Sequence, residues 1–259
     1  MILSHTHKFI FFCSSRVATT SMEEALGSLQ EGAEYDLGLP ESGIPRKHVP
    51  PAILRGALQE TIWEEYFKFV FVRNPWDWFI SQLYYNWIGP YARAAAPSVS
   101  PPRKRAWRAL PRQLSKPRPE PSGRPPDDLV VTADQVDTVF EFLKRFKGLP
   151  GRDGLYQSNW VFDMDDRLIV DYVGRYETLD ADFQAIMRHL NLDIRLPHLN
   201  AVPHRDYRSY YSHEARERVG ELWAIDVENF GYVFEPPEAT REGRVGQLDP
   251  SLRTAPSQN

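Results

Sequence analysis

Cysteine is scarce in this sequence of 259 residues and long apolar runs are missing, and each absence excludes a class of protein. Cys13 is the only cysteine, so no disulfide can form within the chain, which fits a reducing compartment. No apolar run approaches the roughly 18 residues that a membrane-spanning helix needs. The first residues also lack the pattern of a secretory signal peptide. We therefore expect a cytoplasmic protein without a membrane span.

A strong excess of charge of one sign is also missing, because the net charge is −4 and the isoelectric point is about 6.0. This balance argues against a general nucleic-acid-binding protein. The positive charge is nevertheless concentrated: residues 97–126 contain eight arginines and lysines but a single acidic residue, Glu120. Ten prolines lie in the surrounding segment 90–127, which we interpret as an insertion. Three interpretations of this insertion are open: a disordered linker, a lid, or a docking surface for an anionic acceptor. The composition favours the disordered linker.

Hydrophobic periodicity predicts an α/β protein. Strands are expected at 8–13, 67–72 and 168–173, and helices at 20–29, 51–65, 76–88, 133–147, 179–190 and 213–229. Because strands alternate with helices, we expect three layers, with a mainly parallel sheet flanked by helices. One domain is expected over 1–235, with the insertion 90–127 inside it, followed by a disordered polar tail over 236–259.

Two helices have further sequence signals. Thr20 and Glu23 have the spacing of a capping box, which predicts that the first helix begins at Thr20. In the helix 76–88, helical spacing places Trp78 and Ser81 on the face opposite the apolar stripe.

The first of two polar loops follows the strand 8–13 and leads into a helix. It contains Arg16 and the hydroxyl groups of Thr19–Ser21. A helix N-terminus presents unpaired N–H groups and a partial positive charge, so it attracts phosphate or sulfate. A guanidinium adds a permanent charge and a planar fork of donors. The alternative is a capped helix with an exposed arginine, and the negative charge of Glu23 at the same helix end mildly favours that alternative.

The second polar loop follows the strand 67–72. It contains Arg73, and Ser81 lies eight residues further along the chain. The carboxyl ends of parallel strands meet at one edge of a sheet, which is where ligands bind in this class of fold. Arginines in both loops therefore predict a ligand with more than one anionic group.

An ATP-binding P-loop is disfavoured by what the first loop lacks. That motif has the form G-x-x-x-x-G-K-[ST], in which the glycines let the backbone wrap around the phosphates. Residues 14–21 contain neither glycine nor lysine, and no aspartate suited to magnesium stands at the strand end near Arg73. A nucleotide-dependent kinase of related architecture stays an alternative.

Four segments, in this order, resemble the sulfotransferases that use PAPS (3′-phosphoadenosine 5′-phosphosulfate), and especially their carbohydrate sulfotransferase branch. The segments are Arg16–Ser21, Arg73–Asp77 with Ser81, 173–183, and 196–211. The first resembles the family's 5′-phosphosulfate loop and the second its 3′-phosphate motif, while the other two resemble segments typical of that branch. The resemblance covers most of 8–88 and 155–235.

This resemblance implies a sulfotransferase fold of the P-loop NTPase type and transfer of the sulfuryl group of PAPS to an acceptor hydroxyl, without a metal ion. The expected acceptor is a carbohydrate or another hydroxyl compound, which can be anionic, and the product nucleotide is PAP. The donor-binding residues that it implies are Arg16, Val17, Ala18, Thr19, Thr20, Ser21, Arg73 and Ser81. The family usually has lysine at the position of Arg16. Arginine cannot donate a proton, so its implied role is electrostatic, and a non-catalytic module that binds PAP or PAPS is a further alternative.

An acceptor hydroxyl needs a general base, and in related enzymes this base lies after the first helix. His48 falls in the corresponding stretch, and imidazole suits the role because its pKa is near neutrality. The alternatives are that His48 is a solvated loop residue and that Glu23 or Glu24 is the base. Gln157 lies in a segment that resembles a family stretch near the acceptor. Ordinary packing is expected of the C-terminal tyrosines Tyr207, Tyr210 and Tyr211.

Overall fold

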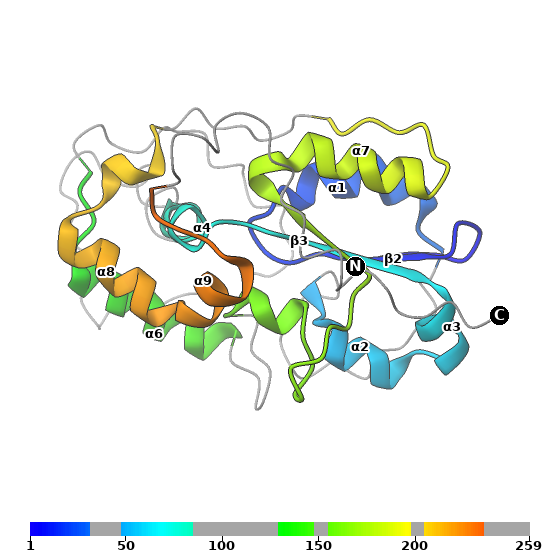
Figure 1. Cartoon of the computed structure of the whole chain (residues 1–259), viewed down its shortest axis with the longest axis horizontal. Helices are drawn as coiled ribbons and strands as arrows, with labels where there is room; N and C mark the ends of the chain where they lie inside the picture. Colours follow the sequence, from blue (N-terminus) through cyan, green and yellow to red (C-terminus); the bar gives the residue numbers. More distant parts are fainter. Residues whose placement is uncertain (32–47, 85–128, 148–154, 198–204, 236–259) are drawn as a thin grey trace, which may run out of the picture.

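The computed structural model of the chain describes residues 1–31, 48–84, 129–147, 155–197 and 205–235 (Figure 1). Its sheet has four strands in the order β1-β2-β3-β4. They are β1 (Ile2–Ser4), β2 (Phe9–Phe12), β3 (Phe67–Val72) and β4 (Tyr172–Arg175). β1 pairs antiparallel with β2, whereas β2, β3 and β4 pair in parallel. The insertion expected at 90–127 and the tail expected at 236–259 lie outside the described residues.

Side-chain alternation along β2 and β3 divides the core in two, because successive residues of a strand point to opposite faces. One face buries Phe9, Phe11, Phe69 and Phe71 under α1 (Thr19–Leu26) and α7 (Leu179–His189). The other face buries Ile10, Phe12, Val70 and Val72. Figure 1 shows α1 and α7 above the sheet and α2 and α3 below it. The expected three-layer α/β fold with a mainly parallel sheet is therefore confirmed.

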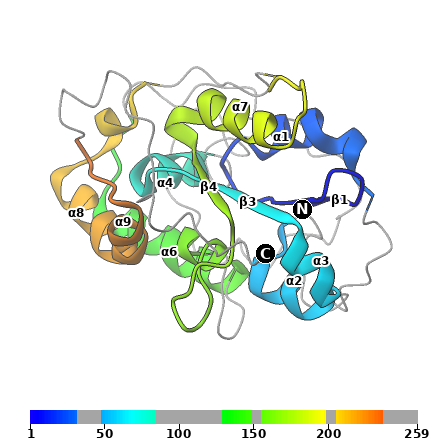
Figure 2. The ribbon, with the colours of Figure 1, turned by 45° about the vertical axis from the view of Figure 1, so that its right-hand side comes forward.

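The remaining elements surround the sheet, as the turned view also shows (Figure 2). The helices are α2 (Pro51–Ala57), α3 (Glu60–Glu65), α4 (Pro75–Leu83), α6 (Ala133–Lys147), α8 (His213–Leu222) and α9 (Ala224–Phe230). The 3₁₀ turns are η1 (Gly27–Leu29), η5 (Gln157–Trp160), η6 (Tyr176–Thr178) and η7 (Tyr207–Tyr210). The expected strand 67–72 and helix 133–147 are confirmed, and α7 ends one residue before the expected boundary.

Two expected helices are each broken into two. The expected helix 51–65 consists of α2 and α3, which are separated by Leu58 and Gln59 in extended conformations. The expected helix 213–229 breaks at Trp223, which joins α8 to α9 with φ −111° and ψ 28°. Apolar spacing does not reveal such breaks, because the residues on both sides still face the same core.

The capping-box prediction for α1 is wrong. α1 begins at Thr19, and its N-cap is Ala18, which has the left-handed values φ 59° and ψ 27° and no side-chain cap. Thr20 therefore lies inside the first turn. The hydroxyl of Thr19 instead donates a 2.7 Å hydrogen bond back to the carbonyl oxygen of Ser14, which closes the preceding loop.

The boundaries of two edge strands also differ from the expectation. β4 begins at Tyr172, so the expected strand 168–173 is shifted toward the C-terminus. Leu168 forms only an isolated bridge with Phe162. β1 was not predicted, because three apolar or small residues are too few to show a period, and we placed the first strand at Lys8.

Gly174 allows β3 and β4 to pack tightly near their carboxyl ends. It stands opposite Phe71 in the register. A Cβ atom at this position would lie 2.4 Å from Cε1 of the Phe71 ring. Any side chain would therefore collide with the Phe71 ring, next to the edge at which the polar loops meet.

Every residue of helix α4 is buried except Ser81, which is half-buried. The described residues of the expected apolar stripe are buried, and Trp78 on the opposite side is only 2% exposed. Its indole Nε1 donates a 2.9 Å hydrogen bond to the carbonyl oxygen of Ser15. This burial arises because α4 lies between the first polar loop and the elements α8 and η7.

Candidate active site

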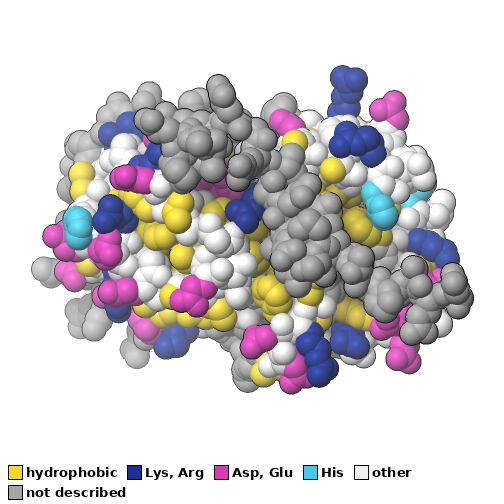
Figure 3. Space-filling model, in the orientation of Figure 1, with side chains coloured by type: hydrophobic (Ala, Val, Ile, Leu, Met, Phe, Trp, Pro, Cys, Tyr) yellow, Lys and Arg dark blue, Asp and Glu magenta, His cyan; other side chains and the backbone are white. Residues whose placement is uncertain are grey.

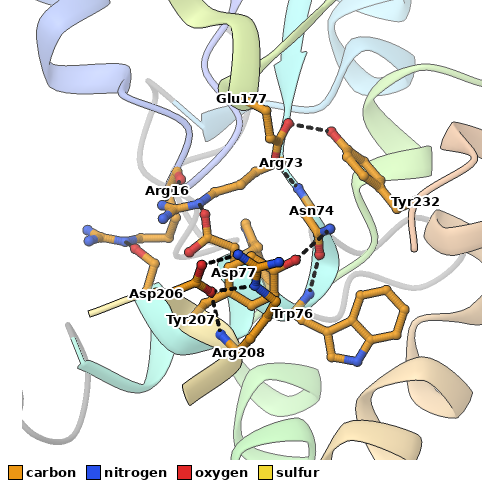
Figure 4. Close-up of polar contacts among 12 residues, drawn as sticks. Arg16, Arg73, Asn74, Trp76, Asp77, Glu177, Asp206, Tyr207, Arg208 and Tyr232 are labelled. Carbon is orange, nitrogen blue, oxygen red and sulfur yellow. Dashed lines mark hydrogen bonds and ion pairs between the residues drawn. The ribbon is translucent and has the colours of Figure 1, made fainter. Parts of the chain in front are cut away.

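Three parallel strands end at the same edge of the sheet, and polar residues follow each of them. The loop 13–18 follows β2, Arg73 and Asn74 follow β3, and η6 follows β4. Figure 4 shows Arg73 reaching from the end of β3 toward Arg16, with Asp77 and Glu177 on either side. The two arginine-containing loops predicted from the sequence therefore form one site.

The first loop is held in place by hydrogen bonds to β3 and α4. The Ser14 hydroxyl donates to the carbonyl oxygen of Phe71 at 2.7 Å. Gln82 of α4 donates from Nε2 to the Ser15 hydroxyl at 3.0 Å, beside the indole bond of Trp78. The carbonyl and hydroxyl oxygens of Ser14 and Ser15 that form these bonds therefore face the protein interior.

The same loop bends back through two residues in the left-handed region. Arg16 has φ 66° and Ala18 has φ 59°. Such values cost a residue with a Cβ roughly 1–2 kcal/mol, so packing must enforce them. Backbones of this kind turn successive N–H groups toward one concave side, which is a common way to bind anions. The first regular helical bond runs from the Met22 N–H to the Ala18 carbonyl, so the amides of Thr19–Ser21 precede the helical ladder.

The predicted loop residues have different surroundings in the structure. Val17 is fully buried in the core beneath α1 and α7, so it offers only backbone atoms. Thr19 and Ser21 are also buried, whereas Thr20 is exposed. Of the predicted hydroxyl groups in this loop, that of Thr20 is therefore the one open to solvent.

Arg16 connects the two loops directly. Its Nε donates to the Ser81 hydroxyl of α4 at 3.0 Å, and both residues are half-buried. Its carbonyl oxygen accepts a 3.2 Å hydrogen bond from Nη1 of Arg73. The three predicted side chains Arg16, Arg73 and Ser81, which are up to 65 positions apart in the sequence, therefore lie in one connected cluster.

Arg73 is almost completely buried, with 4% of its surface exposed. Its Nε donates to Oδ2 of Asp77 at 2.8 Å, and its guanidinium carbon lies 3.9 Å from the ring centre of Tyr176. Burial alone would lower the pKa of Arg73, but the charge and hydrogen bond of Asp77 outweigh burial and raise this pKa. Arg73 is therefore a charged group that already has an internal counter-ion.

Gln157 fixes the backbone of Arg73. Its side-chain Oε1 accepts from the Arg73 N–H and its Nε2 donates to the Arg73 carbonyl, both at 2.7 Å. The backbone N–H of Gln157 donates to the buried carboxylate of Asp226 at 2.9 Å. The resemblance placed Gln157 in a segment near the acceptor, which stays a prediction. Its side-chain amide is bound to the end of β3, a contact across 84 positions that sequence spacing did not indicate.

Glu177 is a further site residue that the sequence analysis missed. Its carboxylate accepts from the Asn74 N–H at 2.6 Å and from the Tyr232 hydroxyl at 3.0 Å. Burial raises the pKa of Glu177, and burial also raises the pKa of Tyr232 well above its ordinary value. The only sequence signal was that Glu177 belongs to one of the segments that resemble the sulfotransferases.

His48 lies beside the end of β2. Its Nδ1 is 2.6 Å from the carbonyl oxygen of Cys13, and the residue is half-buried. A carbonyl oxygen only accepts hydrogen bonds, so this contact requires the proton on Nδ1. In the neutral imidazole the basic nitrogen is then Nε2, which is the protonation state that a general base needs. The other candidates, Glu23 and Glu24, lie on α1 and are half-buried and exposed respectively.

The C-terminal tyrosines pack as expected. Tyr210 is fully buried, and the Tyr211 hydroxyl donates to the Trp76 carbonyl at 2.7 Å. The Tyr207 hydroxyl donates to the Phe234 carbonyl at 2.8 Å and accepts from Nδ2 of Asn74 at 3.3 Å. These residues support the second loop from the side of η7.

Two negative findings apply to the described ranges only. No cluster of three or more His, Cys, Asp or Glu side chains with metal-binding geometry is found among them. Within the same ranges, none of the helices combines the length and the apolar character needed to cross a bilayer.

The comparison with protein families agrees with this arrangement. The sequence model of the sulfotransferase family matches residues 1–233, which include all of the strand ends described above. The chain therefore belongs to the sulfotransferase family, which confirms the resemblance inferred from four segments at the level of that family. Neither the comparison with curated proteins nor that with solved structures found a match.

Proposed function

We propose that this sulfotransferase uses PAPS as the sulfuryl donor and a carbohydrate hydroxyl as the acceptor. The observation that carries the proposal is the direct contact between the two strand-end loops, in which Arg16 donates to Ser81 and Arg73 donates to the Arg16 carbonyl. PAPS has anionic groups at both its 5′ and its 3′ positions. A site with two linked arginines at one sheet edge suits such a ligand.

The first loop is assigned to the phosphosulfate. Arg16, the Thr20 hydroxyl and the amides at the start of α1 provide positive charge and donors around the transferring group. In sulfuryl transfer, as in phosphoryl transfer, charge spreads over the peripheral oxygens and the leaving oxygen, so catalysis consists mainly of positioning and electrostatic stabilisation. Arg16 stabilises the phosphate oxygen that leaves, without donating a proton to it.

The second loop is assigned to the 3′-phosphate. Arg73 offers a guanidinium whose orientation is set by Asp77 and Tyr176, and Ser81 offers a hydroxyl from α4. A 3′-phosphate distinguishes PAPS and PAP from ATP. This assignment therefore makes nucleotide selectivity a property of the loop after β3.

His48 is assigned as the general base. Its Nε2 accepts the proton of the acceptor hydroxyl while that oxygen forms the new bond to sulfur. The bond between sulfur and the bridging phosphate oxygen breaks, and its electron pair remains on PAP. The hydrogen bond from Nδ1 to Cys13 orients the ring and stabilises the imidazolium that forms.

The acceptor assignment rests on the resemblance to carbohydrate sulfotransferases. On the face shown in Figure 3, basic and acidic side chains of the described residues are interspersed and do not form a continuous basic track. If the acceptor is an anionic glycan, the basic segment 97–126 is the part of the sequence suited to dock it. Deletion of 97–126 should then raise the acceptor KM and remove its dependence on salt.

The kinase alternative is disfavoured by the surroundings of Asp77. This is the carboxylate nearest in sequence to the end of β3, and it forms an ion pair with Arg73 at 2.8 Å, which is not the arrangement of a magnesium ligand. The first loop also lacks the glycines and lysine of an ATP-binding loop.

Calorimetric titration with PAP, and with ATP and magnesium in parallel, tests the donor assignment. We expect PAP to bind and ATP to give no signal. Labelled PAPS with a panel of glycans then tests transfer itself. ATP binding in preference to PAP would refute the donor assignment. PAP binding without transfer to any acceptor would favour the non-catalytic binding module.

A further inference from the structure

Asp77 has an unusual position for a carboxylate. It lies in the first turn of α4 and is 8% exposed. Oδ2 accepts the 2.8 Å hydrogen bond from Nε of Arg73. Oδ1 is buried and has no hydrogen-bond donor among the residues that the structure describes. A buried carboxylate ordinarily has partners for both oxygens, so this one lacks part of its compensation.

The charges around Asp77 do not supply the missing compensation. The carboxylate of Glu177, a residue that is exposed overall, lies on the other side of Arg73 (Figure 4). Burial raises the pKa of Tyr211 well above its ordinary value, and the negative charge of Asp77 raises it further. Burial and the negative charge of Asp77 also raise the pKa of Tyr207. Arg73 is therefore flanked by two acidic groups, of which Asp77 is buried with it and Glu177 belongs to an exposed residue.

The orientation of Arg73 depends on more than Asp77. The Arg16 carbonyl accepts from its Nη1, and the Tyr176 ring stacks on its guanidinium. Gln157 holds its backbone on both sides. These contacts are neutral, so they orient Arg73 but do not balance its positive charge. That balance comes from Asp77.

We infer that Asp77 is the resident anion of the 3′-phosphate subsite. This inference rests on the proposed function, because it takes the ligand group at Arg73 to be the 3′-phosphate. In the ligand-free protein Asp77 neutralises Arg73. When the nucleotide binds, its 3′-phosphate enters beside Arg73 and therefore lies near the carboxylate of Asp77. Both groups are negatively charged, so their repulsion opposes binding. Asp77 therefore lowers the affinity for 3′-phosphorylated nucleotides, which favours release of the product PAP.

The test compares Asp77→Asn with the wild-type protein by calorimetry, using PAP and adenosine 5′-phosphosulfate, which lacks the 3′-phosphate. Asparagine keeps the shape and a carbonyl acceptor for Nε of Arg73 but removes the charge. We expect Asp77→Asn to bind PAP about tenfold more tightly, on the scale of a removed like-charge contact, with the affinity for adenosine 5′-phosphosulfate unchanged. Glu141→Gln on α6 removes an exposed carboxylate as the matched control and should leave both affinities unchanged.

A purely structural role of Asp77 gives a different result. In that case Asp77→Asn weakens both nucleotides together, or weakens PAP, and either outcome overturns the inference. Asp77→Ser serves as a second neutral variant, with a thermal melt of each protein to show that it is folded. Wild-type protein that does not bind PAP overturns the proposed function and this inference with it. PAP binding that is equal in wild type and Asp77→Asn overturns the inference alone.

Discussion

The loops after β2 and β3 look alike in sequence, since each places an arginine between a strand and a helix, but the structure gives the two arginines different surroundings. Arg16 is half-buried and donates to a neutral hydroxyl, whereas Arg73 is 4% exposed and ion-paired with Asp77. The first loop uses left-handed backbone at positions 16 and 18, while the second is held by the side chains of Gln157 and Glu177. Arg16, whose partner is neutral, suits a ligand group whose charge changes during the reaction. Arg73, whose charge is balanced by Asp77, suits a ligand group that is only bound.

The largest expected effect sharpens the catalytic side of this comparison, which includes His48, whose Nδ1 contacts the first loop at the Cys13 carbonyl. His48→Gln should lower kcat by roughly 10²–10⁴-fold, the usual range for loss of a general base, and leave PAP affinity unchanged. The measurement is single-turnover transfer from labelled PAPS together with PAP titration. Glu24→Gln is the matched variant, and a loss of kcat in that variant but not in His48→Gln would assign the base to α1.

Arg16→Ala should have the next largest effect, a decrease in kcat of about 10²–10³-fold, because it removes a donor aimed at developing charge. Arg16→Lys should retain most of the activity, since lysine keeps the charge. The exposed Arg188 of α7 provides a control, Arg188→Ala, that removes a distant positive charge. If Arg16→Ala raised KM for PAPS with kcat unchanged, its loop would only bind the donor, and the distinction between the loops would be lost.

Arg73→Ala should act on binding and on stability. PAP affinity should fall by about 10–100-fold, the value of a charge-assisted hydrogen bond, with a much smaller change for adenosine 5′-phosphosulfate. The melting temperature should also fall, because Asp77 is left buried without its counter-ion. Arg16→Ala should cause little change in melting temperature. Equal loss of both nucleotides after Arg73→Ala would contradict the 3′-phosphate assignment.

The smallest expected effect concerns the pH dependence of stability at the second loop. Burial raises the pKa of Glu177 above its ordinary value near 4.5, so the folded state binds this proton more tightly than the unfolded state does. The contribution of Glu177 to the free energy of unfolding therefore decreases as the pH rises from about 4.5 through the raised pKa. Glu177→Gln does not titrate, so its melting temperature should gain on that of the wild type over this interval. A constant difference between the two proteins would show that Glu177 does not contribute in this way.

Most of the fold could be predicted from the sequence, because it depends on short-range patterns. The predicted bounds of β2, β3, α6 and α7 differ by at most one residue from the observed bounds. The errors occurred where a local pattern had more than one outcome. The break at Trp223 preserves apolar spacing, and the Thr20 capping signal was overridden by the left-handed turn at Ala18.

The candidate site was predicted in part. Placing Arg16 and Arg73 at one sheet edge required only the parallel order of β2 and β3. Gln157 and Glu177 could not be placed, because they reach the second loop from 84 and 103 positions away in the chain. The position of Asp77 four residues after Arg73 was visible in the sequence, but an i, i+4 spacing does not reveal whether the pair is buried.

The sequence by itself determined which chemical groups follow each strand, and the alternation of strands with helices indicated a parallel sheet that would bring them to one edge. The tertiary structure decided how each group is compensated. It balanced Arg73 with Asp77, set the Arg16 side chain against a hydroxyl, and placed His48 so that its Nδ1 donates to the Cys13 carbonyl. The reason is physical: residue type sets the charge that a group can carry, but burial and the partners that packing supplies set the free energy of that charge in the folded protein.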